Sequence, residues 1–131
     1  MLLLILLSLS SSVFAQTIDA DISGDNSVVY IHQINSNKTI DVDVNGDTAN
    51  LQLQQKDSGA HNITLDISGD NIEASILQQG SGSHAATIGL ENAGGAIDFE
   101  LSQSGTTNKS HTSSTTCYVA AGCSVSYSQT D

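Results

Sequence analysis

The stretch that decides the fold is LQQGSGSHAATIGL, from Leu77 to Leu90, in which two short apolar runs flank a glutamine pair and a glycine-serine segment. One occurrence of this pattern predicts a loop, whereas its return at a fixed interval predicts a structural repeat. Glycines recur at spacings of 22, 23 and 25 residues, and a glutamine follows nine residues after each. The glycines are Gly24, Gly46, Gly69 and Gly94, and the glutamines are Gln33, Gln55, Gln78 and Gln103. Four copies of one repeat are therefore predicted, and Gly122 with Gln129 indicates a degenerate fifth copy.

Each copy contains two segments in which apolar and polar residues alternate, which is the period of a β-strand. One segment leads up to the glutamine, and the other precedes the glycine. In the first copy the apolar face consists of Ile18, Ala20, Ile22, Val29 and Ile31, and it ends at Gln33. The opposite faces carry polar residues such as Asp19, Asp21, Asp41 and Asp43, so they are expected to face water. Each repeat is thus a strand, a turn, a second strand and a second turn.

Strands with a single apolar face cannot bury it alone, but two strands face to face, stacked copy upon copy, enclose a thin continuous core. We therefore predict an all-β fold, an amyloid-like β-solenoid of about four to five strand-turn-strand repeats of roughly 22–25 residues. The repeat glutamines are expected to point inward and to stack as amide ladders. An antiparallel sandwich or barrel also uses short alternating strands, but it does not explain why glutamine returns at one offset.

Composition narrows the possible functions of this chain. The 131 residues include 3 Lys and Arg against 14 Asp and Glu, for a formal net charge of −11, which argues against nucleic acid as a partner. Aromatic residues make up only 4% and there is no Trp, so a globular core of large side chains is not expected. Proline, which interrupts β-ladders, is absent.

The N-terminal segment, residues 1–15, is predicted to be a secretory signal peptide. It has an apolar run from Leu2 to Leu9, then small residues and the cleavage pattern Val13-Phe14-Ala15. No Lys or Arg precedes the apolar run, which leaves open a start further upstream. Export to an oxidising compartment favours a disulfide between Cys117 and Cys123, with two buried free thiols as the alternative.

Two copies of the repeat carry a family resemblance. The segment from Gln78 to Ala85 resembles the curlin repeat, S-x5-Q-x-G-x-x-N-x-A-x3-Q, with Ser83 in place of Asn, and the segment from Gln103 to Ser110 resembles it with Ser in place of Ala. The turns after Gln33 and Gln55 depart from the motif. The resemblance covers roughly residues 27–110, and its positions are Ser27, Gln33, Gln55, Gln78, Gly80, Ala85, Gln103, Gly105 and Asn108.

This resemblance divides the chain after the signal peptide into a curlin-like β-solenoid, residues 16–110, and a degenerate C-terminal repeat, residues 111–131. It implies a secreted subunit or nucleator of a curli-like amyloid fibre on the cell surface of a Gram-negative bacterium, serving biofilm matrix and adhesion. The expected partners are further copies of the chain, a second curlin-like subunit and an outer-membrane export channel. The alternative is a monomeric secreted β-solenoid adhesin that recognises a surface through one flat face.

No catalytic, cofactor-binding or metal site is predicted. The chain has no G-x-S-x-G elbow, and carboxylate pairs such as Asp19 and Asp21 are expected to solubilise an exposed face. His61 and His84 both follow a repeat glutamine by six residues, but a metal needs three or four ligands, so two exposed turn residues are expected instead. The SGDN and NGDT turns lack the calcium nonapeptide and are assigned to Asx-turns.

Stacked copies are also expected to align their outward aspartates in rows of like charge. Because assembly would bring further acidic rungs together, polymerisation is expected to be faster near pH 5 than near pH 8.

Overall fold

The computed structural model describes residues 3–10, 16–34, 37–57, 59–81, 83–92, 94–105, 108–117 and 122–131, and these residues form strands and turns without a helix. None of the described residues therefore belongs to a helix able to cross a membrane. The strands are β1 (Leu3–Ser10), β2 (Gln16–Ser23), β3 (Ser27–Ile34), β4 (Lys38–Asn45), β5 (Ala49–Lys56), β6 (His61–Ser68), β7 (Ile72–Gln79), β8 (His84–Asn92), β9 (Ile97–Ser104), β10 (Lys109–Cys117) and β11 (Cys123–Thr130).

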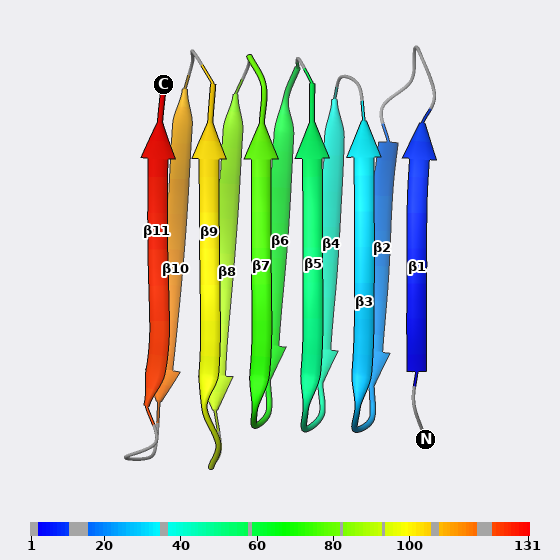
Figure 1. Ribbon diagram of the computed structural model, residues 1–131, viewed down its shortest axis with the longest axis vertical. Helices are drawn as coiled ribbons and strands as arrows, with labels where there is room; N and C mark the ends of the chain where they lie inside the picture. Colours follow the sequence, from blue (N-terminus) through cyan, green and yellow to red (C-terminus); the bar gives the residue numbers. More distant parts are fainter. Residues whose placement is uncertain are drawn as a thin grey trace.

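The strands lie in two facing parallel sheets (Figure 1). One sheet has the order β1-β3-β5-β7-β9-β11 and the other has the order β10-β8-β6-β4-β2. From β2 onward the chain alternates between the sheets, so that each pair of successive strands forms one rung of a stack. The predicted β-solenoid is confirmed, with five complete rungs from β2–β3 to β10–β11.

The register places equivalent positions of successive repeats directly beside one another. Leu53 of β5 pairs with Ile31 on one side and with Ile76 on the other, and Val42 of β4 pairs with Ala20 and Leu65. A parallel ladder in this register puts like side chains in columns, and the inward columns close a core between the two sheets. Ile31, Leu53 and Ile76 are buried there, as the alternating pattern predicts.

In two columns of turn residues the backbones of successive rungs lie so close together that a side chain does not fit between them. A Cβ atom on Gly69 would lie 2.1 Å from the carbonyl oxygen of Gly46, and a Cβ atom on Gly105 would lie 1.9 Å from that of Gly80. Only glycine fits such an approach. Gly94 differs from the other three repeat glycines, because its N–H donates to the carboxylate of Asp70. The turn from β8 to β9 is longer than the earlier turns of this kind, which shifts Gly94 out of the column of Gly69.

The two ends of the chain extend the stack beyond the segment in which the motif was found. β1, within the predicted signal peptide, pairs along its whole length with β3 as a sixth strand of the first sheet. The signal-peptide interpretation of residues 1–15 stays a prediction. At the other end, β10 begins at Lys109 and pairs with β8 from Lys109 to Cys117, so the solenoid continues into residues 111–131.

Candidate functional site

The repeat glutamines form one hydrogen-bonded column through the stack. Gln55 Nε2 donates to Gln33 Oε1 at 2.9 Å, and Gln78 Nε2 donates to Gln55 Oε1 at 3.1 Å. Gln103 and Gln129 continue the column, each donating at 2.7 Å to the glutamine of the preceding rung. The column has one direction, because in each of these four bonds Nε2 donates to the glutamine of the preceding, N-terminal rung.

Each interior glutamine also joins the two sheets. Gln55 Nε2 donates to the backbone carbonyl of Asn62 at 3.1 Å, and Gln78 Nε2 donates to that of Ala85 at 2.9 Å. Gln103 makes the same bond to Ser110 at 3.2 Å. The carbonyls belong to β6, β8 and β10, which face the strands that carry the glutamines. Both N–H groups of the amide are therefore used, which offsets the cost of burying it completely.

The other positions of the curlin-like motif lie around the turns at the two ends of the strands. Ser27 is buried and its hydroxyl donates to the carbonyl of Gly24 at 3.1 Å. Gly80 and Gly105 share one column, in which Asp57 precedes them with a positive φ of 76°. The carbonyl of Asn108 accepts the backbone N–H of His84 at 2.7 Å. These residues stabilise the turns and their stacking.

A second inward column consists of basic side chains, and it corrects the expectation that the histidines are exposed. His61 and His84 begin β6 and β8, are each only 1% exposed, and their ring centroids lie 4.7 Å apart. Lys38, the partner of His61 in β4, is also 1% exposed, with Nζ 3.4 Å from His61 Nε2. Counting two residues back from Ile63 and Ala86 identifies both histidines as inward positions, which is the signal that the turn assignment overlooked.

Burial controls the protonation of this basic column. Desolvation, followed by the charge of Lys38, lowers the pKa of His61 from 6.5 to about 4. Desolvation also lowers the pKa of Lys38, against the opposing effect of Asp57. His61 Nε2 lies 2.7 Å from the carbonyl oxygen of Asp57, a distance at which this nitrogen carries the hydrogen and donates it. Within the described residues there is no group of three or more His, Cys, Asp and Glu side chains that could hold a metal ion.

The lowered pKa of His61 predicts a loss of stability in acid. The unfolded chain takes up a proton near pH 6.5 and the folded chain only near pH 4, so the contribution of His61 is complete above pH 6.5 and declines as the pH falls toward 4. We expect urea unfolding to show a loss on the order of 1 kcal/mol over this interval, after allowance for solvent screening. His61→Gln, which places in the third rung the residue type that Gln16 supplies in the first, should flatten this dependence. An unchanged pH profile in His61→Gln would contradict the assignment.

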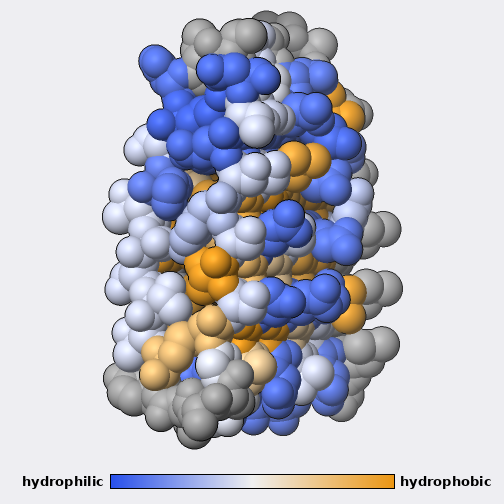
Figure 2. Space-filling view, turned by 60° about the vertical axis from the view of Figure 1, so that its left-hand side comes forward, coloured by the Kyte–Doolittle hydropathy of each residue, from blue (hydrophilic) through white to orange (hydrophobic). Residues whose placement is uncertain are grey.

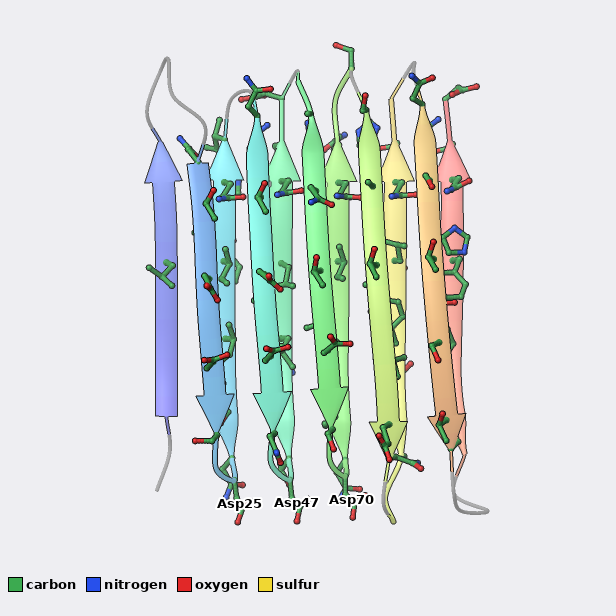
Figure 3. The ribbon with its side chains drawn as sticks, turned by 180° about the vertical axis from the view of Figure 1, so that it is seen from behind. Asp25, Asp47 and Asp70 are labelled. Atoms are coloured by element: carbon green, nitrogen blue, oxygen red, sulfur yellow. A yellow bond between two sulfur atoms is a disulfide. The ribbon has the colours of Figure 1, made fainter. Side chains whose placement is uncertain are left out.

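The aspartates of the SGDN-type turns bond between rungs rather than within a turn. Asp25, Asp47 and Asp70 lie in one row along the lower turns (Figure 3). Asp25 Oδ1 accepts the backbone N–H of Asp47 at 3.2 Å, and Asp47 Oδ1 accepts that of Asp70 at 3.3 Å. This correction to the Asx-turn assignment gives each carboxylate a donor in the next rung. Local sequence could not reveal it, because the donor lies 22 or 23 residues further along the chain.

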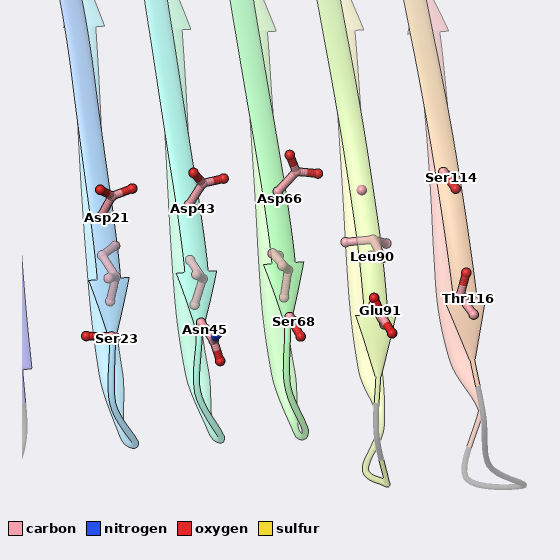
Figure 4. A pocket seen from close by; sticks show the side chains of 14 residues that line it. Asp21, Ser23, Asp43, Asn45, Asp66, Ser68, Leu90, Glu91, Ser114 and Thr116 are labelled. Carbon is pink, nitrogen blue, oxygen red and sulfur yellow. The ribbon is translucent and has the colours of Figure 1, made fainter.

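The outward face of the second sheet carries rows of carboxylates. Asp21, Asp43 and Asp66 lie side by side along one edge of a shallow groove of about 610 Å³ (Figure 4). The pKa of Asp43 is raised, first by desolvation and then by the charges of Asp21 and Asp66. The row ends before the C-terminal rung, because the next two positions are Gly89 and Ser114. This row of aspartates is therefore confined to β2, β4 and β6.

The C-terminal rung leaves the core open. Val125 and Tyr127 of β11 pack against the core but are only partly buried, and Gln129 is exposed. Apolar surface is visible between polar residues on the side of the molecule that includes this end (Figure 2). Among the described strands, β10 and β11 each pair on one side only. Gln129 Oε1 accepts no hydrogen bond from the described part of the chain, so the glutamine column ends there with a free acceptor.

A disulfide and an ion pair hold this last rung together. Cys117 at the end of β10 is bonded to Cys123 at the start of β11. Lys109 Nζ donates to the Asp131 carboxylate, and this bond lowers the pKa of Asp131. β10 itself is mostly exposed and contributes little apolar surface, so covalent closure replaces part of the packing that the interior rungs have.

Loss of the disulfide should loosen the last rung more than the rest of the chain. A bond between residues six apart closes a small loop, which is worth about 2 kcal/mol in the chain-entropy model. In Cys117→Ser/Cys123→Ser we expect faster amide exchange in β10 and β11, residues 109–117 and 123–130, with β4 to β7 little changed. Thiols of Cys117 and Cys123 that react with an alkylating agent in the native exported protein would contradict the disulfide.

Comparison with known proteins adds no relative, because no protein-family model, curated protein or solved structure matches this chain.

Proposed function

We propose that this chain is a structural subunit of a curli-like extracellular fibre that grows by stacking the strand edges of successive copies. The observation that carries the proposal is the C-terminal end of the solenoid, where both sheets, the core and the glutamine column stop without a cap in the described residues. Parallel strand edges template further strands. A head-to-tail contact of this kind does not close on itself, so it produces a filament.

Continuing the register across a junction defines which surfaces meet. β10 of one copy pairs with β2 of the next, which places Thr112 beside Asp19 and Ser114 beside Asp21. The acidic rows therefore meet neutral hydroxyl groups at the junction. A junction of this kind does not bring acidic rungs together, contrary to the expectation from the sequence. Faster polymerisation near pH 5 than near pH 8 therefore no longer follows from repulsion at the junction. The repulsion acts within each copy, where Asp43 lies between Asp21 and Asp66.

Secretion and the roles of other proteins complete the proposal. The signal peptide at residues 1–15 would direct export, and a dedicated outer-membrane channel would deliver the chain to the cell surface as biofilm matrix. A second curlin-like subunit would share the repeat and the end surface. The support is the motif at Gln78–Ala85 and Gln103–Ser110 together with the stacked columns in which its residues lie.

A pair of substitutions at the open end tests the proposal. Val125 faces the core of the junction and Ser124 faces water, on adjacent positions of β11. Val125→Lys places a charge where the next copy must stack, while in the free chain the long side chain can reach water. We expect the unchanged chain and Ser124→Lys to form fibres that bind thioflavin T and give a reflection at about 4.7–4.8 Å, and Val125→Lys to elongate at least about tenfold more slowly.

The outcomes separate the fibre from the adhesin alternative. A chain that stays monomeric and binds a surface through the face lined by Asp21, Asp43 and Asp66 would favour the adhesin. Fibres formed equally fast by Val125→Lys and Ser124→Lys would show that polymerisation does not use this end.

A further inference from the structure

The N-terminal end of the stack is uneven. β1 lies on the outer edge of β3, while the neighbouring strand β2 forms the edge of the other sheet. Figure 1 shows β1 standing alone beyond the first complete rung. At the C-terminal end both sheets stop at the same rung, with β11 at the edge of one sheet and β10 at the edge of the other. Such an end cannot pair with β2 and β3 of another copy at the same time while β1 occupies the edge of β3.

β1 occupies the position that β11 of a second copy would take. It pairs with β3 in parallel, from Leu3 with Ser27 to Ser10 with Ile34. Continuing the register of the odd-numbered strands beyond β11 sets Cys123 beside Ser27 of the next copy and Thr130 beside Ile34. The two strands therefore compete for the same eight positions of one edge.

β1 is an incomplete substitute for a rung of the solenoid. Leu9 is the partner of Gln33 and has no amide, so the glutamine column stops there. Gln33 Nε2 makes the same cross-sheet bond as the later glutamines, to the carbonyl of Thr39 at 3.1 Å, but in place of a bond to a preceding glutamine it donates to the backbone carbonyl of Gln16 at 3.2 Å. In the same register, β11 of a second copy would place Gln129 beside Gln33. Its Oε1 could then accept from Gln33 Nε2, as the Oε1 of the preceding glutamine does for every later glutamine of the column at 2.7–3.1 Å.

We propose that β1 is a displaceable cap on the edge of β3, and that β11 of a second copy, docked head to tail, replaces it. The exchange joins the two glutamine columns, with Gln33 Nε2 donating to Gln129 Oε1 of the neighbouring copy. It also covers the partly exposed Tyr127 with Ile31. Removal of residues 1–15 would leave the same edge open, so cleavage of the signal peptide would turn a capped chain into one ready to polymerise. This inference rests on the proposed fibre function.

Full-length chains test the cap. Leu6→Pro/Leu7→Pro removes two adjacent backbone N–H groups, one of which points toward β3, and so weakens the pairing of β1. Ser11→Pro/Ser12→Pro is the matched control, because these residues lie outside the described strands. We expect the first variant to shorten the lag of thioflavin T fluorescence by about threefold or more, since a larger fraction of chains has an open edge. The control should keep the lag of the unchanged chain.

A second measurement needs no substitution. The amides of residues 3–10 that point toward β3 should be protected from hydrogen exchange in the monomer and should exchange in the fibre, while residues 27–34 stay protected in both states. Protection of residues 3–10 within the fibre would overturn the cap. Equal lag times for all three chains, each forming fibres, would also overturn it and leave the fibre function standing. Absence of fibres from every chain would contradict the fibre function and the cap together.

Discussion

Replacing Gln55 and Gln78 together by leucine should destabilise the folded chain by about 3 kcal/mol or more and lengthen the lag before fibres form. The double change removes the donor to Gln33 Oε1 and the acceptor of Gln103 Nε2, and it takes a donor from two backbone carbonyls. These groups are buried in a core that cannot supply water as a replacement. The gain in apolar surface offsets only part of the loss. Urea unfolding of the double variant and of the unchanged chain measures the loss of stability, and thioflavin T kinetics measure the lag before fibres form.

The same strands provide a matched control. Gln52 of β5 and Gln79 of β7 are exposed, so Gln52→Leu/Gln79→Leu makes the same change of composition without touching the column. We expect this control to stay within about 0.5 kcal/mol of the unchanged chain. Equal losses in the two double variants would show that the buried amides do not hold the stack together.

Substituting alanine for Gly69 should be among the most damaging single changes in the turns. Its Cβ atom would lie 2.1 Å from the carbonyl oxygen of Gly46, and a backbone atom cannot move aside without separating two rungs. Separation weakens the strand pairing of β4 with β6 next to the turn. We expect a loss of several kcal/mol, on the order of 3, and a chain that forms fibres poorly.

The variant Gly24→Ala separates the effect of the close contact between rungs from the effect of the backbone conformation. Gly24 also has a positive φ, 114°, but no atom lies within 4 Å of a Cβ atom placed on it, because it belongs to the first rung. Gly24→Ala should therefore lose only about 1–2 kcal/mol, the cost of the left-handed conformation. If thermal unfolding places the two variants at the same midpoint, the close approach of the rungs is not what selects glycine at position 69.

The repeat allowed the architecture to be predicted from the sequence. A period of two within each copy and a constant glycine-to-glutamine offset restrict how the strands can pack. Ile31, Leu53 and Ile76 lie inward as the alternation predicts. The ends of the strands were harder to predict, because polar residues there give no hydropathy signal. Lys38, His61 and His84 are inward by register alone, and a buried basic column contradicts the usual preference of such residues for water.

Contacts between rungs could not be predicted from the sequence, for a different reason. The bond from Asp47 to Asp25 joins residues 22 apart, and the displacement of Gly94 onto Asp70 follows from a longer turn. Such pairings depend on the register in three dimensions. The uneven N-terminal end was also hidden, because the apolar run of residues 3–10 is typical of a signal peptide and carries no glutamine.

Site-specific cross-linking tests the central claim, head-to-tail growth through the strand edges, most directly. Continued register places Ser114 of one copy beside Asp21 of the next, and both side chains are exposed. Two chains, Ser114→Cys and Asp21→Cys, each keeping the native disulfide, are polymerised separately or as a mixture and then oxidised. The head-to-tail account predicts a disulfide-linked heterodimer on a denaturing gel from the mixture, and only monomers from either chain alone. Homodimers of Ser114→Cys or of Asp21→Cys, or fibres of the mixture without the heterodimer, would contradict it.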